Sequence, residues 1–337
     1  MIAKQSETLN ELRYPNIALS QSARHPSHPR TLSTKPIMQN EDIHINDTIS
    51  RRNFGLGAVS AVAAGASMTV ALPNLSALQA ADPVDGKKGK LKQSVCKWCY
   101  GKLSLEEMCN AAVKLGLVGI DLLKPEDFAT LKKHGLMCTM VSSHPLTDGL
   151  CDEKYHEASL KTLNEVIEAT STAGYRNVIC FSGNARGIDR KTGLKNCAAA
   201  LKKIVGIAEK KNVIINMELL NSRVDHPDYM CDNSAWGIEL CKEVGSNHFK
   251  LLYDIYHMQI MEGDIIRSIQ KNHQYFGHYH TGGNPGRHEL NDQQELFYPA
   301  IAKAIAETGF DGFFAHEFIP VGDPITGLTD AVKLCLV

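Results

Sequence analysis

The chain of 337 residues has almost no net charge: 36 Lys and Arg face 37 Asp and Glu, which leaves −1 at pH 7. Proteins that bind nucleic-acid phosphates need a basic face, so we expect no nucleic-acid partner. Charged residues make up only 22% of the chain and hydrophobic residues 43%. This balance excludes extensive disorder beyond residue 90 and suffices for one large domain with a substantial core.

The ten cysteines lack two patterns, that of a disulfide framework and that of a zinc site. Their spacing lacks the pattern of a small disulfide framework, and the pair Cys96 and Cys99 has no second CxxC that would complete a zinc site. On a strand these two side chains would point to opposite faces. We interpret the cysteines as small buried hydrophobic residues of a protein that folds in a reducing compartment.

The N-terminal region lacks the periodicity of the rest. Residues 1–50 are polar and expected to be disordered, and residues 82–90 resemble a linker. Between them, residues 51–81 run from an Arg pair through a weakly apolar stretch to small residues, which predicts a cleaved twin-arginine-type signal peptide. We therefore expect periplasmic export without stable membrane insertion; a membrane anchor by an uncleaved signal is the alternative. Met1 and Met38 are alternative starts, and Met38 would leave a signal of ordinary length.

From residue 91 onward the chain has no two-residue hairpin turns. Apolar strand-like runs are predicted at 92–97, 118–123, 137–143, 177–183, 213–219, 249–255, 275–280 and 312–318. Amphipathic helical stretches separate several of them, at 104–116, 152–174, 193–212, 233–245 and 296–309. Parallel strands with helical crossovers follow, and eight units predict a (β/α)8 TIM barrel over residues 91–337. An open doubly wound sheet is the alternative, but it prefers a Gly-rich loop after the first strand, and that loop is missing.

Four consecutive strand ends each carry one hard ligand, at Glu218, Asp254, His280 and Glu317. In a barrel these ends meet at the C-terminal mouth, where catalytic residues lie. Buried carboxylates without a partner are costly, and a shared cation removes that cost. Three carboxylates and one imidazole suit Mn²⁺, Mg²⁺ or Co²⁺, so we predict one divalent metal ion; zinc is less favoured because no thiolate is expected at these ends.

Other polar residues near the strand ends are candidates for supporting roles. His278 shares a face with His280 and is expected to orient the site through a hydrogen bond. The glycines after this strand keep the open side of the metal clear, and Arg287 returns over the mouth to bind an oxyanion. His257 is expected at the start of a loop facing the mouth. The remaining candidates are His144 and Trp98, whereas Asp225 and His226 are expected in a surface loop.

The segments "INMELLNSRVDHPDY", "YDIYHMQ", "HYHTGGNPGRHE" and "AHEF" resemble the hydroxypyruvate isomerase branch of the xylose-isomerase-like TIM barrels. The resemblance covers residue 92 to the C-terminus, and its specific part lies in the last four strands. It implies that the four strand-end residues named above are metal ligands. It also implies that Glu218 and Glu317 form the acid/base pair and that His257 and Arg287 hold the substrate.

The resemblance and the residues together predict an enzyme that moves a proton between neighbouring carbons of a 2-hydroxy carbonyl compound through an enediolate. The first choice is isomerisation of hydroxypyruvate to tartronate semialdehyde. A ketose 3-epimerase is the alternative, because His280 stands where the isomerases often carry Gln and the epimerases carry His. A non-catalytic exported sugar-binding barrel is the alternative of another class. A small hydroxy-carbonyl compound or sugar is thus the expected partner, and a homo-oligomer is possible.

Overall fold

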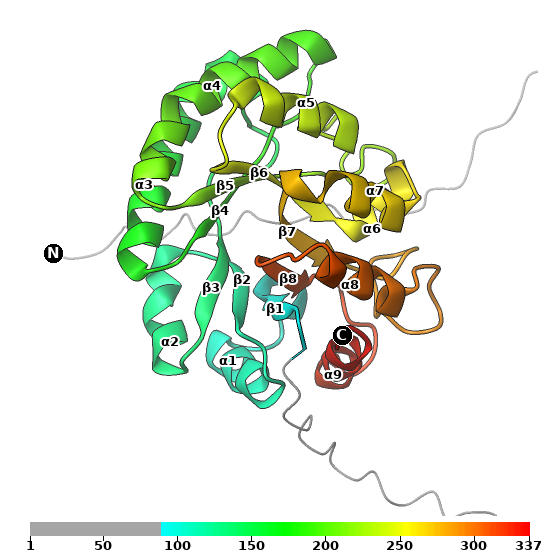
Figure 1. Cartoon of the computed structure of the whole chain (residues 1–337). Coiled ribbons are helices and arrows are strands. Elements are labelled where there is room, and N and C mark those ends of the chain that lie inside the picture. The colour runs from blue at the N-terminus through cyan, green and yellow to red at the C-terminus, as the bar shows by residue number, and fades with distance from the viewer. Residues whose placement is uncertain (1–88) are drawn as a thin grey trace, which may run out of the picture. The chain divides into compact units, whose positions relative to one another are not determined.

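A computed structural model describes residues 89–337 as a closed barrel of eight parallel strands, in which each strand pairs with the next and β8 with β1 (Figure 1). The TIM-barrel prediction is therefore confirmed, and the open sheet is not formed. The predicted disordered extension, the signal peptide and all but the end of the linker lie outside the described residues. Lys90 donates its backbone N–H to the carbonyl of Val337 at 2.7 Å, so the first described residues lie beside the C-terminus.

The eight strands agree with the predicted ones to within three residues at each end. Most of their residues are buried, as expected for parallel strands covered on both faces. Their bounds are β1 Lys92–Cys96, β2 Gly119–Leu123, β3 Met137–Val141, β4 Asn177–Cys180, β5 Ile214–Glu218, β6 Phe249–Asp254, β7 Phe276–Thr281 and β8 Phe313–His316.

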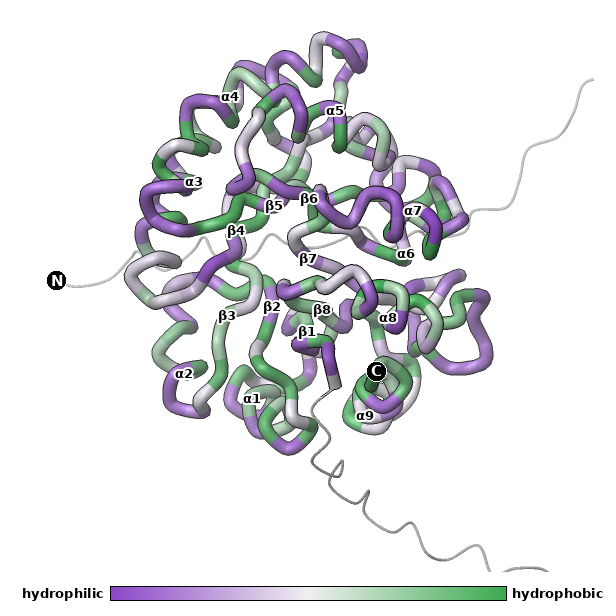
Figure 2. Tube along the Cα trace, viewed as in Figure 1, coloured by the Kyte–Doolittle hydropathy of each residue, from purple (hydrophilic) through white to green (hydrophobic). Residues whose placement is uncertain are grey.

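The α-helices surround the strands, and their turns alternate hydrophobic with hydrophilic residues (Figure 2). Five were predicted: α1 Leu105–Lys114, α3 His156–Ala173, α4 Arg190–Lys210, α5 Ser234–Val244 and α8 Tyr298–Glu307. The sequence did not predict α2 Phe128–Lys133, α6 Ile255–Met261, α7 Ile265–Asn272 and α9 Pro324–Leu334. Ser104 and Glu107 form a capping box at the start of α1, and Gly174 ends α3 in the left-handed conformation, at φ 80°.

Alternation along the strands decides which side chains face the inside of the barrel. Met140, Ile179 and Leu252 pack together as a small inner cluster, separate from the larger core between strands and helices. Asp254 lies two residues beyond Leu252 and therefore points inward as well. It pairs in register with His280 on β7, so the two side chains reach the C-terminal mouth at the same level.

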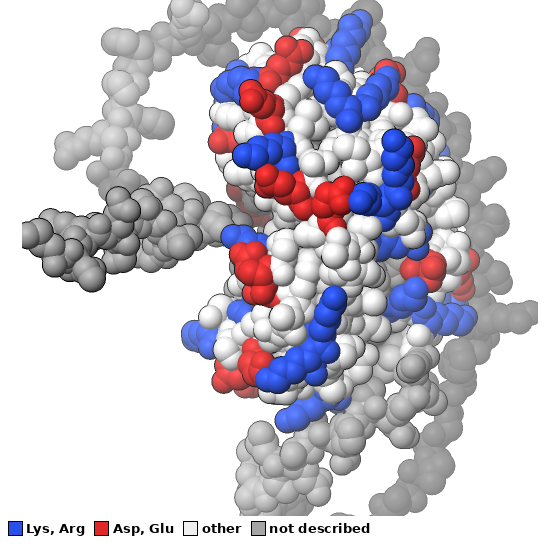
Figure 3. All heavy atoms as spheres, turned by 90° about the vertical axis from the view of Figure 1, so that its left-hand side faces the viewer, with Lys and Arg blue, Asp and Glu red and all other residues white. Residues whose placement is uncertain are grey.

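The surface of the described domain is mixed in charge where Figure 3 shows it: Lys and Arg alternate with Asp and Glu, without a patch of one sign. Within residues 89–337, none of the helices combines the length and the apolar character needed to cross a membrane. All ten cysteines lie in this part of the chain, buried and with free thiols. This agrees with their interpretation as small hydrophobic residues.

Candidate metal and substrate site

The barrel brings the four predicted metal ligands together. Glu218, Asp254, His280 and Glu317 each offer one ligand atom, and these atoms all lie within 4.8 Å of one another. Glu218 ends β5, Asp254 ends β6 and His280 lies within β7. Glu317 directly follows β8. All four side chains are buried. Four residues that span a hundred positions of sequence thus form one cluster at the C-terminal mouth.

His280 lies at the centre of this cluster. Its Nδ1 is 2.7 Å from Oε2 of Glu317, 3.3 Å from Oε1 of Glu218 and 3.9 Å from Oδ2 of Asp254. Nδ1 is within ion-pair distance of all three carboxylates, but none of these contacts has the geometry of a hydrogen bond. A cation between the nitrogen and the oxygens would satisfy all four groups, so the residues present fit a divalent metal ion.

The protonation equilibria of these carboxylates show the cost of placing them together. Burial raises the pKa of Glu218, and the neighbouring Glu317 and Asp254 add to the shift. Burial also raises the pKa of Asp254. Burial acts on Glu317 in the same sense, but His280 and Arg287 outweigh it and hold the pKa of Glu317 well below its ordinary value. Without additional positive charge, the site resists full ionisation of its carboxylates.

The other edge of His280 is held by Asp121, a residue of β2 that the sequence interpretation missed. Oδ2 of Asp121 lies 3.1 Å from Nε2 of His280 and 2.6 Å from Nε2 of His278. Its Oδ1 accepts hydrogen bonds from the hydroxyls of Ser94, at 2.8 Å, and Thr139. Four donors therefore fix this buried carboxylate. His278 does form a hydrogen bond within the site, as expected, but with Asp121 and not with one of the four predicted ligands.

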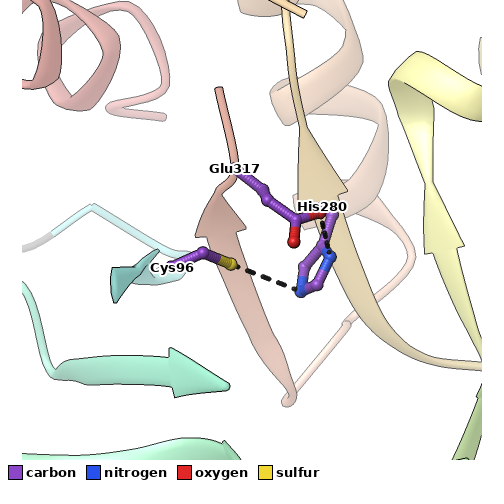
Figure 4. Close-up of side chains that lie close together, drawn as sticks. All are labelled: Cys96, His280 and Glu317. Atoms are coloured by element: carbon purple, nitrogen blue, oxygen red, sulfur yellow. Dashed lines mark hydrogen bonds and ion pairs between the residues drawn. The ribbon is translucent and has the colours of Figure 1, made fainter. Parts of the chain in front are cut away.

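Cys96 approaches His280 from the same edge as Asp121. Its Sγ lies 3.8 Å from Nε2, whereas Glu317 faces Nδ1 on the opposite side of the ring (Figure 4). A thiol therefore reaches the mouth from the end of β1, whereas the ends of β5 to β8 carry no thiol, as expected. It faces the ring nitrogen that points away from the three carboxylates, so it does not extend their oxygen-rich ligand set. Burial raises the pKa of this thiol well above its ordinary value, which favours the neutral form.

Arg287 reaches the mouth as predicted, but protein groups occupy its terminal nitrogens. Nη2 donates to Oδ2 of Asp254 at 2.7 Å and also bonds Oε2 of Glu317, and Nη1 lies 2.8 Å from Nε2 of His257. Only Nε is buried without a hydrogen bond. The guanidinium therefore offsets the charge of two predicted ligands, and a bidentate contact with a substrate would require a rearrangement of its present contacts.

The glycines after β7 allow the following loop to fold back closely. A Cβ atom on Gly283 would lie 2.4 Å from the carbonyl oxygen of Glu289, and one on Gly282 would lie 3.1 Å from Cγ of Arg287. The backbone of Arg287 itself is left-handed, at φ 57°, a conformation uncommon outside glycine. The glycines thus position Arg287 by close approach of backbone segments, in addition to leaving the mouth free of side chains.

His257 lies in the first turn of α6, so the expectation that it starts a loop is wrong. Asp254 caps this helix by accepting the backbone N–H of His257 at 3.0 Å. The ring is buried, with its Nδ1 2.6 Å from Nδ2 of Asn221. The loop after β5, expected at the surface, also contributes: the half-buried ring of His226 lies 5.2 Å from that of His257, and Asp225 bonds Asn221.

Trp98 and His144 occupy different positions. Trp98 lies at the rim of the mouth, 39% exposed, and donates its Nε1–H to Oε1 of Glu317 at 2.6 Å. His144 is buried between the ends of β3 and β4: its Nδ1 is 3.1 Å from the carbonyl of Pro145, and its Nε2 accepts the N–H of Phe181. The backbone therefore uses both ring nitrogens of His144, whereas Trp98 directly contacts a predicted ligand.

The family model described as "Xylose isomerase-like TIM barrel" matches residues 124–334. The chain belongs to this family, which confirms the resemblance seen in the sequence.

Several individual proteins are similar to the chain. A "2-oxo-tetronate isomerase" of Cupriavidus necator is 34% identical over 139 residues, which cover 41% of this chain and 51% of that one. A human "Putative hydroxypyruvate isomerase" is 29% identical over 129 residues, with coverage of 38% and 47%. These matches span about half the length of the relatives. The solved D-psicose 3-epimerase of Clostridium cellulolyticum shares the fold, with a TM-score of 0.57, 18% identity and coverage of 72% and 90%.

Proposed function

We propose that the chain is a metal-dependent isomerase of a short 2-oxo acid with a hydroxyl group on the neighbouring carbon, with hydroxypyruvate as the first choice. The observation that supports this most is the cluster of three buried carboxylates and one imidazole with ligand atoms within 4.8 Å of one another. The names of the two sequence relatives, for 2-oxo-tetronate and for hydroxypyruvate, describe 2-oxo acids of this kind.

Glu218, Asp254, His280 and Glu317 would hold one divalent ion, Mn²⁺, Mg²⁺ or Co²⁺. When bound, the ion acts as a Lewis acid that polarises the carbonyl and hydroxyl oxygens of the substrate. Oxygen ligands dominate the set, and the thiol of Cys96 lies on the other edge of His280, so hard cations are favoured over zinc.

Glu218 and Glu317 would exchange the proton. They come from β5 and from the end of β8, and both lie beside Nδ1 of His280, at 3.3 and 2.7 Å. One carboxylate removes the proton from C3 of hydroxypyruvate, and a proton is returned at C2, while the hydroxyl proton moves to the former carbonyl oxygen. The C3 hydroxyl becomes the aldehyde and the C2 carbonyl becomes the hydroxyl, which gives tartronate semialdehyde without any change in atoms.

Arg287 and His257 would bind the oxygens of the substrate. The guanidinium is a buried cation in direct contact with Asp254, and a carboxylate substrate supplies an anion for it once its contacts with Asp254 and Glu317 rearrange. This requirement favours an oxo acid over a neutral ketose. A ketose 3-epimerase remains the second candidate because histidine stands at position 280.

The test is a substrate screen of the purified full chain in D₂O with added Mn²⁺, Mg²⁺ or Co²⁺, read by proton NMR. We expect exchange of the C3 protons of hydroxypyruvate and appearance of the aldehyde, and loss of both after chelation by EDTA. Exchange at C3 of ketoses such as D-fructose, without turnover of 2-oxo acids, would favour the epimerase. Metal binding without exchange in any substrate would favour the non-catalytic sugar-binding barrel.

The export prediction has its own measurement. Fractionation of cells that express the chain, with N-terminal sequencing, would show whether residues 51–81 are cleaved and the barrel reaches the periplasm. An uncleaved chain in the membrane fraction would favour the anchor instead.

A further inference from the structure

Asn221 follows β5 and has an orientation that its neighbours fix. One side-chain atom accepts the backbone N–H groups of Val224, at 3.0 Å, and Asp225, at 2.8 Å. Backbone N–H groups can only donate, so this atom is the carbonyl oxygen, Oδ1. The amide nitrogen Nδ2 must then point the other way.

The amide nitrogen has two hydrogens and two neighbours. One neighbour is Oδ2 of Asp225, at 2.7 Å, and a carboxylate oxygen accepts. The other is Nδ1 of His257, at 2.6 Å. The second hydrogen of Asn221 therefore points at Nδ1, which has to offer a lone pair. In a neutral imidazole the ring proton then resides on Nε2.

We propose that Asn221 is a positioning residue that fixes His257 as its Nε2–H tautomer, so that the ring presents a hydrogen-bond donor to the mouth of the barrel. The tautomer is inferred from the contacts of Asn221, which holds its donor at Nδ1 more firmly than Arg287 holds its own at Nε2. That the acceptor is an oxygen of the substrate rests on the function proposed above.

The contact between His257 and Arg287 has to change for this tautomer to form. Nη1 of Arg287 lies 2.8 Å from Nε2 of His257 and can only donate, so the proposed tautomer requires Arg287 to give up this contact. Four hydrogen-bonding contacts hold Asn221 in place, whereas a long arginine side chain adjusts more readily. An acceptor oxygen that enters between the two donors satisfies both, and His257 is only 2% exposed, which limits access of bulk water.

The first measurement reads the tautomer directly. The full chain, labelled with ¹⁵N-histidine and containing Mg²⁺, is studied by long-range ¹H–¹⁵N correlation NMR, and the His257→Gln variant identifies the signals of this ring among the 14 histidines. We expect a neutral ring with its proton on Nε2. A ring with its proton on Nδ1, or protonated on both nitrogens, would overturn the proposal without recourse to any variant of Asn221.

The second experiment uses variants that should move the ring proton of His257 to the other nitrogen. In Asn221→Asp, a carboxylate oxygen replaces the amide that faces Nδ1, so the ring proton should move to Nδ1. Asp225→Asn is the matched control, because its side-chain oxygen can still accept from Asn221, and it should keep the Nε2 proton. The double variant, Asn221→Asp with Asp225→Asn, preserves the net charge and should also show the Nδ1 proton. Retention of the Nε2 proton in both variants that carry Asn221→Asp would contradict the role of Asn221.

Kinetics separate this inference from the proposed function. In the charge-preserving double variant, KM for hydroxypyruvate should rise about tenfold or more because a donor to the substrate is lost, while the affinity for Mg²⁺ stays the same. Unchanged KM would refute the contact with substrate. If the wild-type chain turned over no 2-oxo acid but had the Nε2 proton, the proposed substrate would fail while the tautomer assignment held.

Discussion

Replacing Asp121 by asparagine tests how strongly the proposed metal site depends on a residue that is not one of its predicted ligands. Asp121 accepts from Nε2 of both His278 and His280, at 2.6 and 3.1 Å, and all three side chains are fully buried. With its ring proton directed at Asp121, His280 would offer the lone pair of Nδ1 to a metal ion. The substituted asparagine could still direct its oxygen at the two rings, because the hydroxyls of Ser94 and Thr139 can rotate to accept from its amide nitrogen.

The substitution therefore removes negative charge more than it removes hydrogen bonds. Charge-assisted hydrogen bonds are about twice as strong as neutral ones, and the loss of such an outer partner typically costs about 10- to 100-fold in metal affinity. We expect the Kd for Mn²⁺ to rise by about this factor, which corresponds to roughly 1.4 to 2.7 kcal/mol. The loss is larger for Asp121→Ala, which leaves two buried imidazole N–H groups without an acceptor.

Isothermal titration calorimetry of the full chain with Mn²⁺ measures this effect independently of turnover. Ser94→Ala is the matched control, because it removes one neutral donor to Asp121, at 2.8 Å, and leaves the carboxylate and both histidine contacts in place. Its affinity should stay within a few-fold of wild type. Equal affinities of wild type and Asp121→Asn would refute the orienting role, and absence of binding to the wild type would refute the metal site itself.

Three further variants address the acid/base pair, the rim of the mouth and acid stability. Glu317→Gln should retain the metal but lose well over about 100-fold in kcat, since it removes a proton acceptor. Trp98→Phe keeps an aromatic ring but loses the bond to Glu317, and kcat should fall about tenfold, as for a hydrogen bond to a charged group. Burial lowers the pKa of His144 from 6.5 to about 4, so the folded state loses about 3 kcal/mol from this group as pH falls from 6.5 towards 4. His144→Gln, compared with wild type by urea unfolding at pH 7 and 4.5, should show a correspondingly smaller loss.

Each of these expectations has a contrary result. Near-normal turnover of Glu317→Gln would remove it from the acid/base pair. Unchanged kcat in Trp98→Phe would show that the indole N–H does not assist Glu317. For His144, equal losses of stability in wild type and variant between the two pH values would show that the ring is not held neutral by burial in the native state.

The sequence predicted the barrel and its four convergent residues because both follow from local patterns. In the sequence, parallel strands appear as apolar runs. A charged residue or a histidine at the end of such a run can only point into the mouth or towards the helices. Glu218, Asp254 and His280 were found in this way. Asp121 carries the same indication, an acid within the buried run "VGIDLL", but it was overlooked because it lies in the middle of its strand rather than at the end.

Contacts that depend on side-chain conformation could not be derived from the pattern. Arg287 was placed over the mouth correctly, but its bonds to Asp254 and Glu317 depend on a loop that returns through a left-handed residue. His257 was assigned to a loop because α6 is only seven residues long, too short to show helical periodicity. Asn221 belongs to the motif that carried the family resemblance, yet its role appears only in the pairing of its two amide atoms with particular neighbours.

The charges at the mouth explain both why the site favours a metal ion and why Arg287 contacts the predicted ligands. Glu218, Asp254, Asp121 and Glu317 place four acids in a small buried volume, and the loss of hydration costs several kcal/mol for each ion that stays charged. Arg287 offers one permanent positive charge, and His280 can offer a second only by taking up a proton, which removes it as a metal ligand. A divalent cation would restore the balance while His280 remains neutral, and it would compete with the guanidinium for Asp254 and Glu317. On the proposed function, binding of the metal and availability of Arg287 for an anionic substrate would then be consequences of the same charge balance.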